Sequence, residues 1–139
     1  MRMQFPITEK TYHRWTKHFN ADMDLVHPFI FTDTISEKYD YVFVLNHGTE
    51  SGYLWNGELQ TTQTVSEFVN YLYETRPSLK QWKQIVLLCC HGGLIHNDME
   101  NTVVIANETV NELHAWPPVM CCTLGDELCE FTFTVEAED

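Results

Sequence analysis

The chain has 139 residues, of which 44% are hydrophobic and 13% aromatic, so residues 1–139 can enclose a core as one domain and are not an intrinsically disordered chain. Its longest apolar run, residues 85–90, is far shorter than the roughly 20 residues that a membrane-spanning helix requires, which excludes such a helix. The net charge of −12 disfavours direct binding to nucleic acid.

The N-terminal third predicts one helix and two strands. Residues 8–19 have the signature of a helix, because Thr8 can cap it and aromatic residues recur at spacings of three and four. Residues 27–34 predict a short strand. Residues 39–46 predict a stronger one, since they are rich in valine and aromatic residues.

The middle of the chain predicts a turn region at 48–57 and then a well-marked helix at 64–75. Thr64 and Glu67 have the spacing of a capping box, and an apolar stripe follows with helical period. Pro77 marks the end of this helix.

The second half predicts mainly strands. Residues 84–90 and 102–106 are apolar without alternation, which is typical of strands in a sheet that is covered on both faces. A short helix is expected at 107–116. Residues 119–124 and 129–137 predict a closing pair of strands, and the alternation in the latter is typical of an exposed edge strand.

This order of strands and helices predicts a compact α/β sandwich with a mostly parallel central sheet flanked by helices. In such sheets, functional groups gather at the carboxyl ends of the strands. The strand at 39–46 is followed by His47, and the strand at 84–90 ends in Cys90. We therefore expect these two residues to lie at one edge of the fold if the two strands are parallel neighbours.

A cysteine and a histidine brought together at strand ends suit nucleophilic chemistry. A thiolate attacks a carbonyl carbon far better than a thiol, and an imidazole can take the thiol proton and return it to a leaving amine. Gly48 and Gly92 leave room for the reacting atoms, and backbone N–H groups there can approach an oxyanion. The simpler alternative for Cys90 is a buried strand-end residue. Cys89 points to the opposite face of a regular strand and is expected in the core.

Two blocks of the sequence resemble those of caspase-like cysteine peptidases. "VFVLNHGTESGYLWNGE" (42–58) resembles their His-Gly block, and "IVLLCCHGG" (85–93) resembles the block that carries their nucleophilic cysteine. The second block is similar to the metacaspase form Asp-Ser/Cys-Cys-His-Ser-Gly. His47 precedes Cys90 by 43 residues, against roughly 50 in caspases. The chain thus resembles a divergent and minimal member of this superfamily.

The resemblance implies a caspase-like fold and a cysteine endopeptidase. Cys90 would be the nucleophile that forms a thioester, His47 its acid–base partner, and the backbone N–H groups of Gly48 and Cys90 the oxyanion donors. Leu88 stands where metacaspases have Asp and caspases have Gln, and His91 stands where caspases have Arg, so neither substrate specificity carries over. The candidates for supporting or pocket positions are Asn46, Leu88, His91, Gly92 and Trp116.

No metal or cofactor is expected. Nearby cysteine and histidine side chains could ligate zinc, but adjacent cysteine pairs do not fit the separation of two to four residues that is typical of zinc sites. These side chains are Cys89, Cys90, His91, His96, Cys121 and Cys122. Calcium at Asp98 and Glu100 is an alternative, because some metacaspases need it.

The cysteines and the N-terminus predict a cytoplasmic protein. Four of the five cysteines form adjacent pairs, and an odd number leaves at least one thiol, which fits a reducing compartment better than a disulfide framework. The N-terminal residues lack the apolar segment of a secretion signal.

The negative charge is concentrated in the second half. Residues 1–83 contain all eight Lys and Arg with ten acidic residues, whereas residues 84–139 contain ten acidic residues and no Lys or Arg. This distribution favours a peptide or protein substrate with a basic segment, although acidity also keeps a small protein soluble. The alternative function is a non-catalytic acidic interaction protein or inhibitor, such as an inactive relative of the peptidases or a nucleic-acid mimic, that binds a basic partner.

Overall fold

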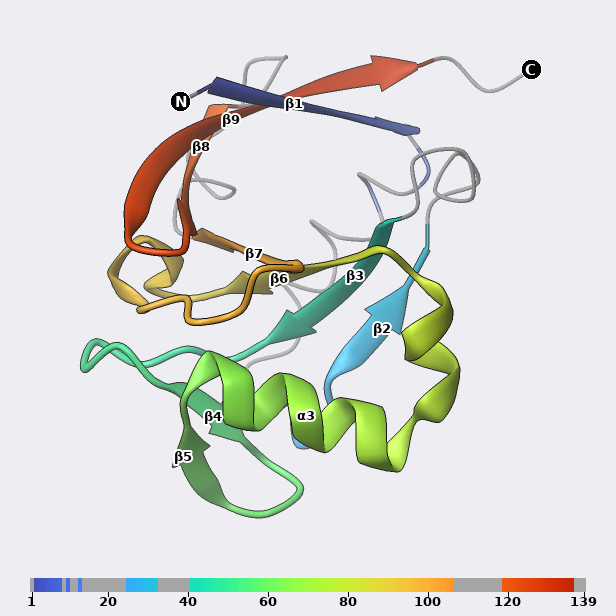
Figure 1. Ribbon diagram of the computed structural model, residues 1–139. Coiled ribbons are helices and arrows are strands. Elements are labelled where there is room, and N and C mark those ends of the chain that lie inside the picture. Colours follow the sequence, from blue (N-terminus) through green and yellow to red (C-terminus); the bar gives the residue numbers. More distant parts are fainter. Residues whose placement is uncertain are drawn as a thin grey trace.

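The computed structural model describes residues 2–8, 10, 13, 25–32, 41–106 and 119–136 (Figure 1). The strands are β1 (Arg2–Thr8), β2 (Phe29–Phe31), β3 (Tyr41–Asn46), β4 (Leu54–Asn56), β5 (Thr61–Gln63), β6 (Gln84–Cys89), β7 (Thr102–Ala106), β8 (Val119–Leu124) and β9 (Glu127–Glu136). The helices are α3 (Val65–Thr75) and the short 3₁₀ segments η1 (Pro77–Gln81) and η2 (Gly92–Leu94).

Seven strands form one mixed sheet in the order β1-β9-β8-β7-β6-β3-β2, and β4 and β5 form a separate hairpin. In the middle of the sheet β3, β6 and β7 are parallel neighbours, and at one edge β1 is parallel to β9. The remaining pairs, β2 with β3, β7 with β8 and β8 with β9, are antiparallel. The prediction of a mostly parallel, helix-flanked α/β sandwich is therefore wrong.

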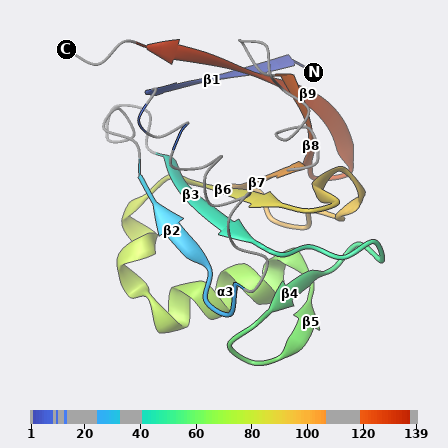
Figure 2. The ribbon, with the colours of Figure 1, turned by 180° about the vertical axis from the view of Figure 1, so that it is seen from behind.

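The reason lies in what covers the central strands. On one face they pack against α3, the one α-helix whose limits fall within the described ranges. On the other face the cover comes from the sheet itself, which curls so that Met120 of β8 and Phe131 of β9 share a core cluster with Phe43 and Val86. Figures 1 and 2 show β8 and β9 on the side of β3, β6 and β7 away from α3. Apolar strands without alternation require two covered faces, but strands can provide that cover as well as helices can.

The helix expected at 64–75 is confirmed as α3. The Thr64 side chain accepts a hydrogen bond from the backbone N–H of Glu67, and the Glu67 side chain accepts one from the backbone N–H of Thr64, which completes the capping box. The apolar stripe packs on strands β3, β6 and β7, and each such buried side chain contributes roughly 1.5–3 kcal/mol. Its buried members are Val65, Phe68, Val69 and Leu72.

Most of the expected strands are present with slightly different limits. The strands expected at 27–34, 39–46, 84–90, 102–106 and 119–124 correspond to β2, β3, β6, β7 and β8. The strand expected at 129–137 is β9, but it lies between β8 and β1 and is not an edge strand.

Two features of the fold were missed. Residues 2–8 form β1, so Thr8 ends a strand and is not the cap of the helix expected at 8–19. Of the rest of that helix only Lys10 and His13 are described, and both are helical. The predicted turn region at 48–57 contains β4, which pairs with β5. The helix expected at 107–116 lies outside the described residues.

The cysteines depart from expectation at one place. A disulfide joins Cys122 of β8 to Cys129 of β9, which are directly paired across the two strands, so this pair is not reduced as we expected. Cys89, Cys90 and Cys121 are not disulfide-bonded. In the described part of the chain, no helix has the length and apolar character to cross a membrane.

Candidate functional site

The carboxyl ends of β3 and β6 bring the predicted catalytic residues to one edge of the sheet. The expected parallel pairing of the two strands is confirmed, and its register ends with Asn46 opposite Cys89. The following residues, His47 and Cys90, leave the sheet side by side, since neighbouring strands are about 4.8 Å apart. Both residues are half-buried, so each retains access to solvent.

The two chain segments that follow these strands touch at Gly48. A Cβ atom placed on Gly48 would lie 2.1 Å from the carbonyl oxygen of Cys90 and 3.0 Å from Cδ1 of Ile95. Real side chains do not approach backbone atoms so closely, so only glycine fits here. The glycine of the His-Gly pair is therefore required for contact between the His47 and Cys90 segments.

Asn46 fixes the backbone at His47. Its side chain is only 4% exposed, and its Nδ2 donates to the carbonyl oxygens of His47 at 3.0 Å and of Trp55 at 2.7 Å. The backbone N–H of Trp55 donates to the same His47 carbonyl at 3.0 Å. The supporting role that we expected for Asn46 is thus structural, because it ties the end of β3 to β4.

The backbone N–H of Gly48 points away from this contact with β4. Gly48 and Leu54 form an isolated antiparallel bridge, flanked by the hydrogen bonds from Trp55 N–H to His47 and from Thr49 N–H to the Tyr53 carbonyl. A residue between two such bonds directs its own N–H away from the partner strand. Within the described residues, the Gly48 N–H has no hydrogen-bond partner.

The segment after Cys90 turns sharply. His91 has φ 57° and ψ 26°, in the left-handed region that few residues other than glycine adopt, and its carbonyl accepts the N–H of Leu94, the last residue of η2. Gly92 is buried against β7, where a Cβ would lie 2.5 Å from the Ile105 carbonyl carbon. Cys90 therefore sits on a tight turn between β6 and η2, packed between the ends of β3 and β7.

The remaining sequence candidates lie elsewhere. Leu88 is fully buried in the core cluster on the β8–β9 side of the sheet, so its side chain belongs to the core. Cys89 is fully buried on the α3 side, as expected. Trp116 lies outside the described residues.

Two exposed apolar side chains stand on the segments that follow β3 and β6. Tyr53 is 45% exposed and Leu94 65% exposed. A Cβ on Gly52 would lie 3.2 Å from the Leu94 carbonyl oxygen, so the turn that precedes Tyr53 packs on η2. Tyr53 and Leu94 thus lie on the two neighbouring segments that follow His47 and Cys90 in the chain.

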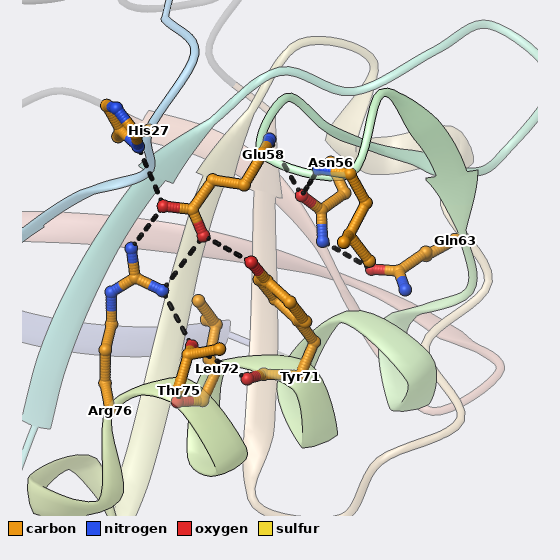
Figure 3. A network of polar contacts seen from close by, with 9 residues as sticks. His27, Asn56, Glu58, Gln63, Tyr71, Leu72, Thr75 and Arg76 are labelled. Carbon is orange, nitrogen blue, oxygen red and sulfur yellow. Dashed lines mark hydrogen bonds and ion pairs between the residues drawn. The ribbon is translucent and has the colours of Figure 1, made fainter.

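The β4–β5 hairpin, which holds His47, is itself anchored to α3 by Glu58 (Figure 3). The Glu58 carboxylate accepts hydrogen bonds from both terminal nitrogens of Arg76, at 3.2 and 2.7 Å, and from the Tyr71 hydroxyl at 2.7 Å. Its Oε2 also lies 2.8 Å from Nδ1 of His27. The hydrogen bond from Arg76 is the main reason that the pKa of Glu58 falls from 4.5 to about 2.

This network was missed from the sequence. The predicted turn region ends at residue 57 and Glu58 appeared only at the end of the 42–58 block, while the partners of Glu58 are 13 to 31 positions away. The hydrogen bond with Glu58 raises the pKa of Tyr71. The network therefore fixes the hairpin to α3.

Asp98, one of the two acidic residues considered for calcium, has a structural role. Asp98 accepts hydrogen bonds from the backbone N–H and the hydroxyl of Ser66, at 2.9 and 2.7 Å, at the N-terminus of α3. Glu100 is exposed. The described residues contain no group of three or more histidine, cysteine or acidic side chains placed to hold a metal ion.

Comparisons with protein-family models, with curated proteins and with solved structures found no match. The similarity to caspase-like peptidases thus rests on the two sequence blocks and on their residues. Those blocks correspond to the segments that meet at Gly48 and Cys90.

Proposed function

We propose that this protein is a cysteine endopeptidase of caspase-like type, with Cys90 as nucleophile and His47 as general acid and base. The observation that carries the proposal is the in-register parallel pairing of β3 and β6, which ends with Asn46 opposite Cys89. That register makes His47 and Cys90 equivalent positions at one edge of the sheet, and no other pairing of the two strands would do so.

The alternation of side chains supports the same arrangement. Asn46 and Cys89 are on the α3 side, and the residues before them, Leu45 and Leu88, are on the opposite side. Carried one residue further, the alternation directs the side chains of His47 and Cys90 to the same face of the sheet. Proton transfer requires the two groups to come within hydrogen-bond distance, and we propose that side-chain rotation brings the thiol and the imidazole together from adjacent strands.

The proposed reaction has two steps. The Cys90 thiol gives its proton to His47, and the thiolate sulfur attacks the carbonyl carbon of a peptide bond. His47 then protonates the departing amine as the carbon–nitrogen bond breaks, which leaves a thioester on Cys90. A water molecule, deprotonated by His47, attacks the thioester, and cleavage of the carbon–sulfur bond releases the carboxylic acid and restores the thiol.

The backbone N–H of Gly48 suits the oxyanion of this reaction. It is directed away from β4 and has no hydrogen-bond partner among the described residues. The loss of one oxyanion donor typically costs about 10²–10³-fold in kcat. The Gly48 N–H is available for this role, and this availability supports the proposal. Tyr53 and Leu94 would contact the apolar side chains of a bound peptide.

Active-site labelling tests this proposal directly. A peptide chloromethyl ketone is expected to alkylate Cys90, as located by mass spectrometry, and the His47→Ala variant should lose this labelling. His96→Ala is the matched control, because it removes an exposed histidine whose ring nitrogen lies 2.9 Å from Asp126. Cys121 is an exposed thiol and reports the rate of non-specific alkylation in the same sample.

Equal labelling of Cys90 in the wild type and in His47→Ala would refute the dyad. Hydrolysis of a casein or peptide-library substrate that survives Cys90→Ala would refute Cys90 as the nucleophile. These two outcomes are independent of each other, so each proposed role is tested separately.

The second candidate function is a non-catalytic acidic protein that binds a basic partner. The concentration of ten acidic residues and no Lys or Arg after residue 83 favours it. Salt-sensitive capture of a basic protein that survives both Cys90→Ala and His47→Ala, with no labelling of Cys90, would support this function over the peptidase.

A further inference from the structure

A cavity of about 440 Å³ opens at the end of β7 that is remote from Cys90. Gly92 packs on the carboxyl end of β7, at Ile105 and Ala106, whereas Asn97 hydrogen-bonds to Thr102 at its start. The two ends are about 13 Å apart at the usual rise of a strand. The cavity is lined by Asn97, Asp98, Met99, Glu100, Leu124 and Gly125.

The walls of this cavity are held in place by hydrogen bonds. Asn97 is 1% exposed, and its side chain donates to the carbonyl oxygens of Thr102 and Thr123 and accepts the N–H of Met99. Asp98 is fixed by its two hydrogen bonds with Ser66. The cavity thus exists before a ligand enters, and its volume is in the range of ligand sites.

The lining combines apolar surface with negative charge. Met99 and Leu124 are partly buried and pack against the two core clusters, while Asp98 and Glu100 are exposed carboxylates. Each oxygen of Asp98 accepts one hydrogen bond, which leaves lone pairs for a further donor. The side chain of Glu100 has no hydrogen bond or ion pair within the described part of the chain, and none of the six lining residues is basic.

A buried hydroxyl without a hydrogen-bond partner in the described part of the chain belongs to Thr123, the residue before Leu124 of the cavity lining. Oγ1 of Thr123 is buried and has no hydrogen-bond partner among the described residues. Cys122 belongs to the cluster on the face away from α3, so alternation along β8 directs the Thr123 side chain to the α3 face, along which Asp98 and Met99 run. Buried polar atoms in proteins are nearly always satisfied, but Thr123 does not itself line the cavity, so its hydroxyl is not counted among the groups that bind a ligand there.

We propose that this cavity binds an arginine side chain from a basic segment of a partner protein. The methylene groups of the arginine would pack on Met99 and Leu124, and its guanidinium would donate to Asp98 and Glu100. Arginine suits the site because it joins an apolar stem to a planar group with five donors. The binding site does not depend on the proposed catalysis.

The test uses the Cys90→Ala protein, so that no substrate is cleaved. The probe is acetyl-Ala-Ala-Arg-Ala-Ala-amide, compared with the same peptide containing uncharged citrulline in place of arginine. We expect the arginine peptide to bind at least about tenfold more tightly in calorimetry, because hydrogen bonds to charged groups are the stronger ones. In the NMR spectrum of ¹³C-methyl-methionine protein, the Met99 methyl signal should shift with the arginine peptide.

Glu100→Gln should weaken binding of the arginine peptide by about tenfold. Glu130→Gln is the matched control, because Glu130 is an exposed residue of the same acidic segment, on β9, and does not line the cavity. An equal loss of affinity for the arginine peptide in the two variants would show that binding depends on the overall negative charge of the protein. That result would overturn the proposed site. Equal affinity for the citrulline peptide, or a Met99 signal that does not move, would also overturn it.

Discussion

Gly48 and Cys90 come from segments 42 positions apart, yet a single Cβ on the glycine would stand 2.1 Å from the cysteine carbonyl oxygen. This contact joins the two strand ends that carry the proposed dyad. The backbone contact therefore sets the spacing between the two segments. A larger residue at Gly48 or Gly92 is expected to change the position and reactivity of Cys90.

Gly48→Ala is expected to destabilise the protein by about 1–3 kcal/mol, because the new methyl group meets backbone atoms that cannot move aside. It should also slow labelling of Cys90 by the peptide chloromethyl ketone. Gly93→Ala is the control, since a Cβ at Gly93 meets nothing within 4 Å. Urea denaturation measures both stabilities, and equal midpoints for the two variants would contradict the contact.

The Glu58 network predicts a specific loss of stability in acid. Because the pKa of Glu58 is about 2 in the folded protein and 4.5 ordinarily, its contribution is complete above pH 4.5 and is lost as the pH falls towards 2. Glu58→Gln should lower the unfolding free energy by about 1–3 kcal/mol at pH 7 and flatten its decline between pH 4.5 and 2. Denaturation at a series of pH values measures both effects.

Glu74→Gln makes the same charge change on an exposed position of α3 and should leave that decline as it is in the wild type. A decline that is equally steep in Glu58→Gln and the wild type would show that Glu58 is not held by Arg76 in solution.

The contact between Asp98 and Ser66 predicts that the loop before β7 stabilises α3. Asp98→Ala removes a carboxylate that accepts a backbone N–H at the helix N-terminus, and we expect a loss of about 1 kcal/mol. Glu100→Ala, two residues further along, should change stability by no more than about 0.5 kcal/mol. Thermal unfolding followed by circular dichroism distinguishes the two, and similar losses would contradict the cap.

The disulfide between Cys122 and Cys129 predicts the pattern of alkylation. Iodoacetamide added to the protein in urea should modify three cysteines without reductant and five after reduction, as counted by mass spectrometry. The bond closes a short loop with a sequence separation of 7, so its reduction should cost about 2–3 kcal/mol of stability. Modification of all five cysteines without reductant would contradict the bond.

The amino-acid sequence by itself determined the local elements that have strong signals. The capping box of Thr64 and Glu67 predicted α3, and the apolar runs at 84–90 and 102–106 predicted β6 and β7, because these patterns depend on neighbours along the chain. The sequence also placed His47 and Cys90 at the ends of two strands, now β3 and β6, and so predicted where the candidate site lies.

Only the tertiary structure decided what covers the central strands and what supports the site. An apolar strand without alternation indicates that both of its faces are buried, but it does not indicate whether helices or a curled sheet bury them. For this reason the prediction of an α/β sandwich was wrong. The partners of Glu58, Asn97 and Gly48 lie on other elements, so their roles depend on contacts between distant segments that no local pattern encodes.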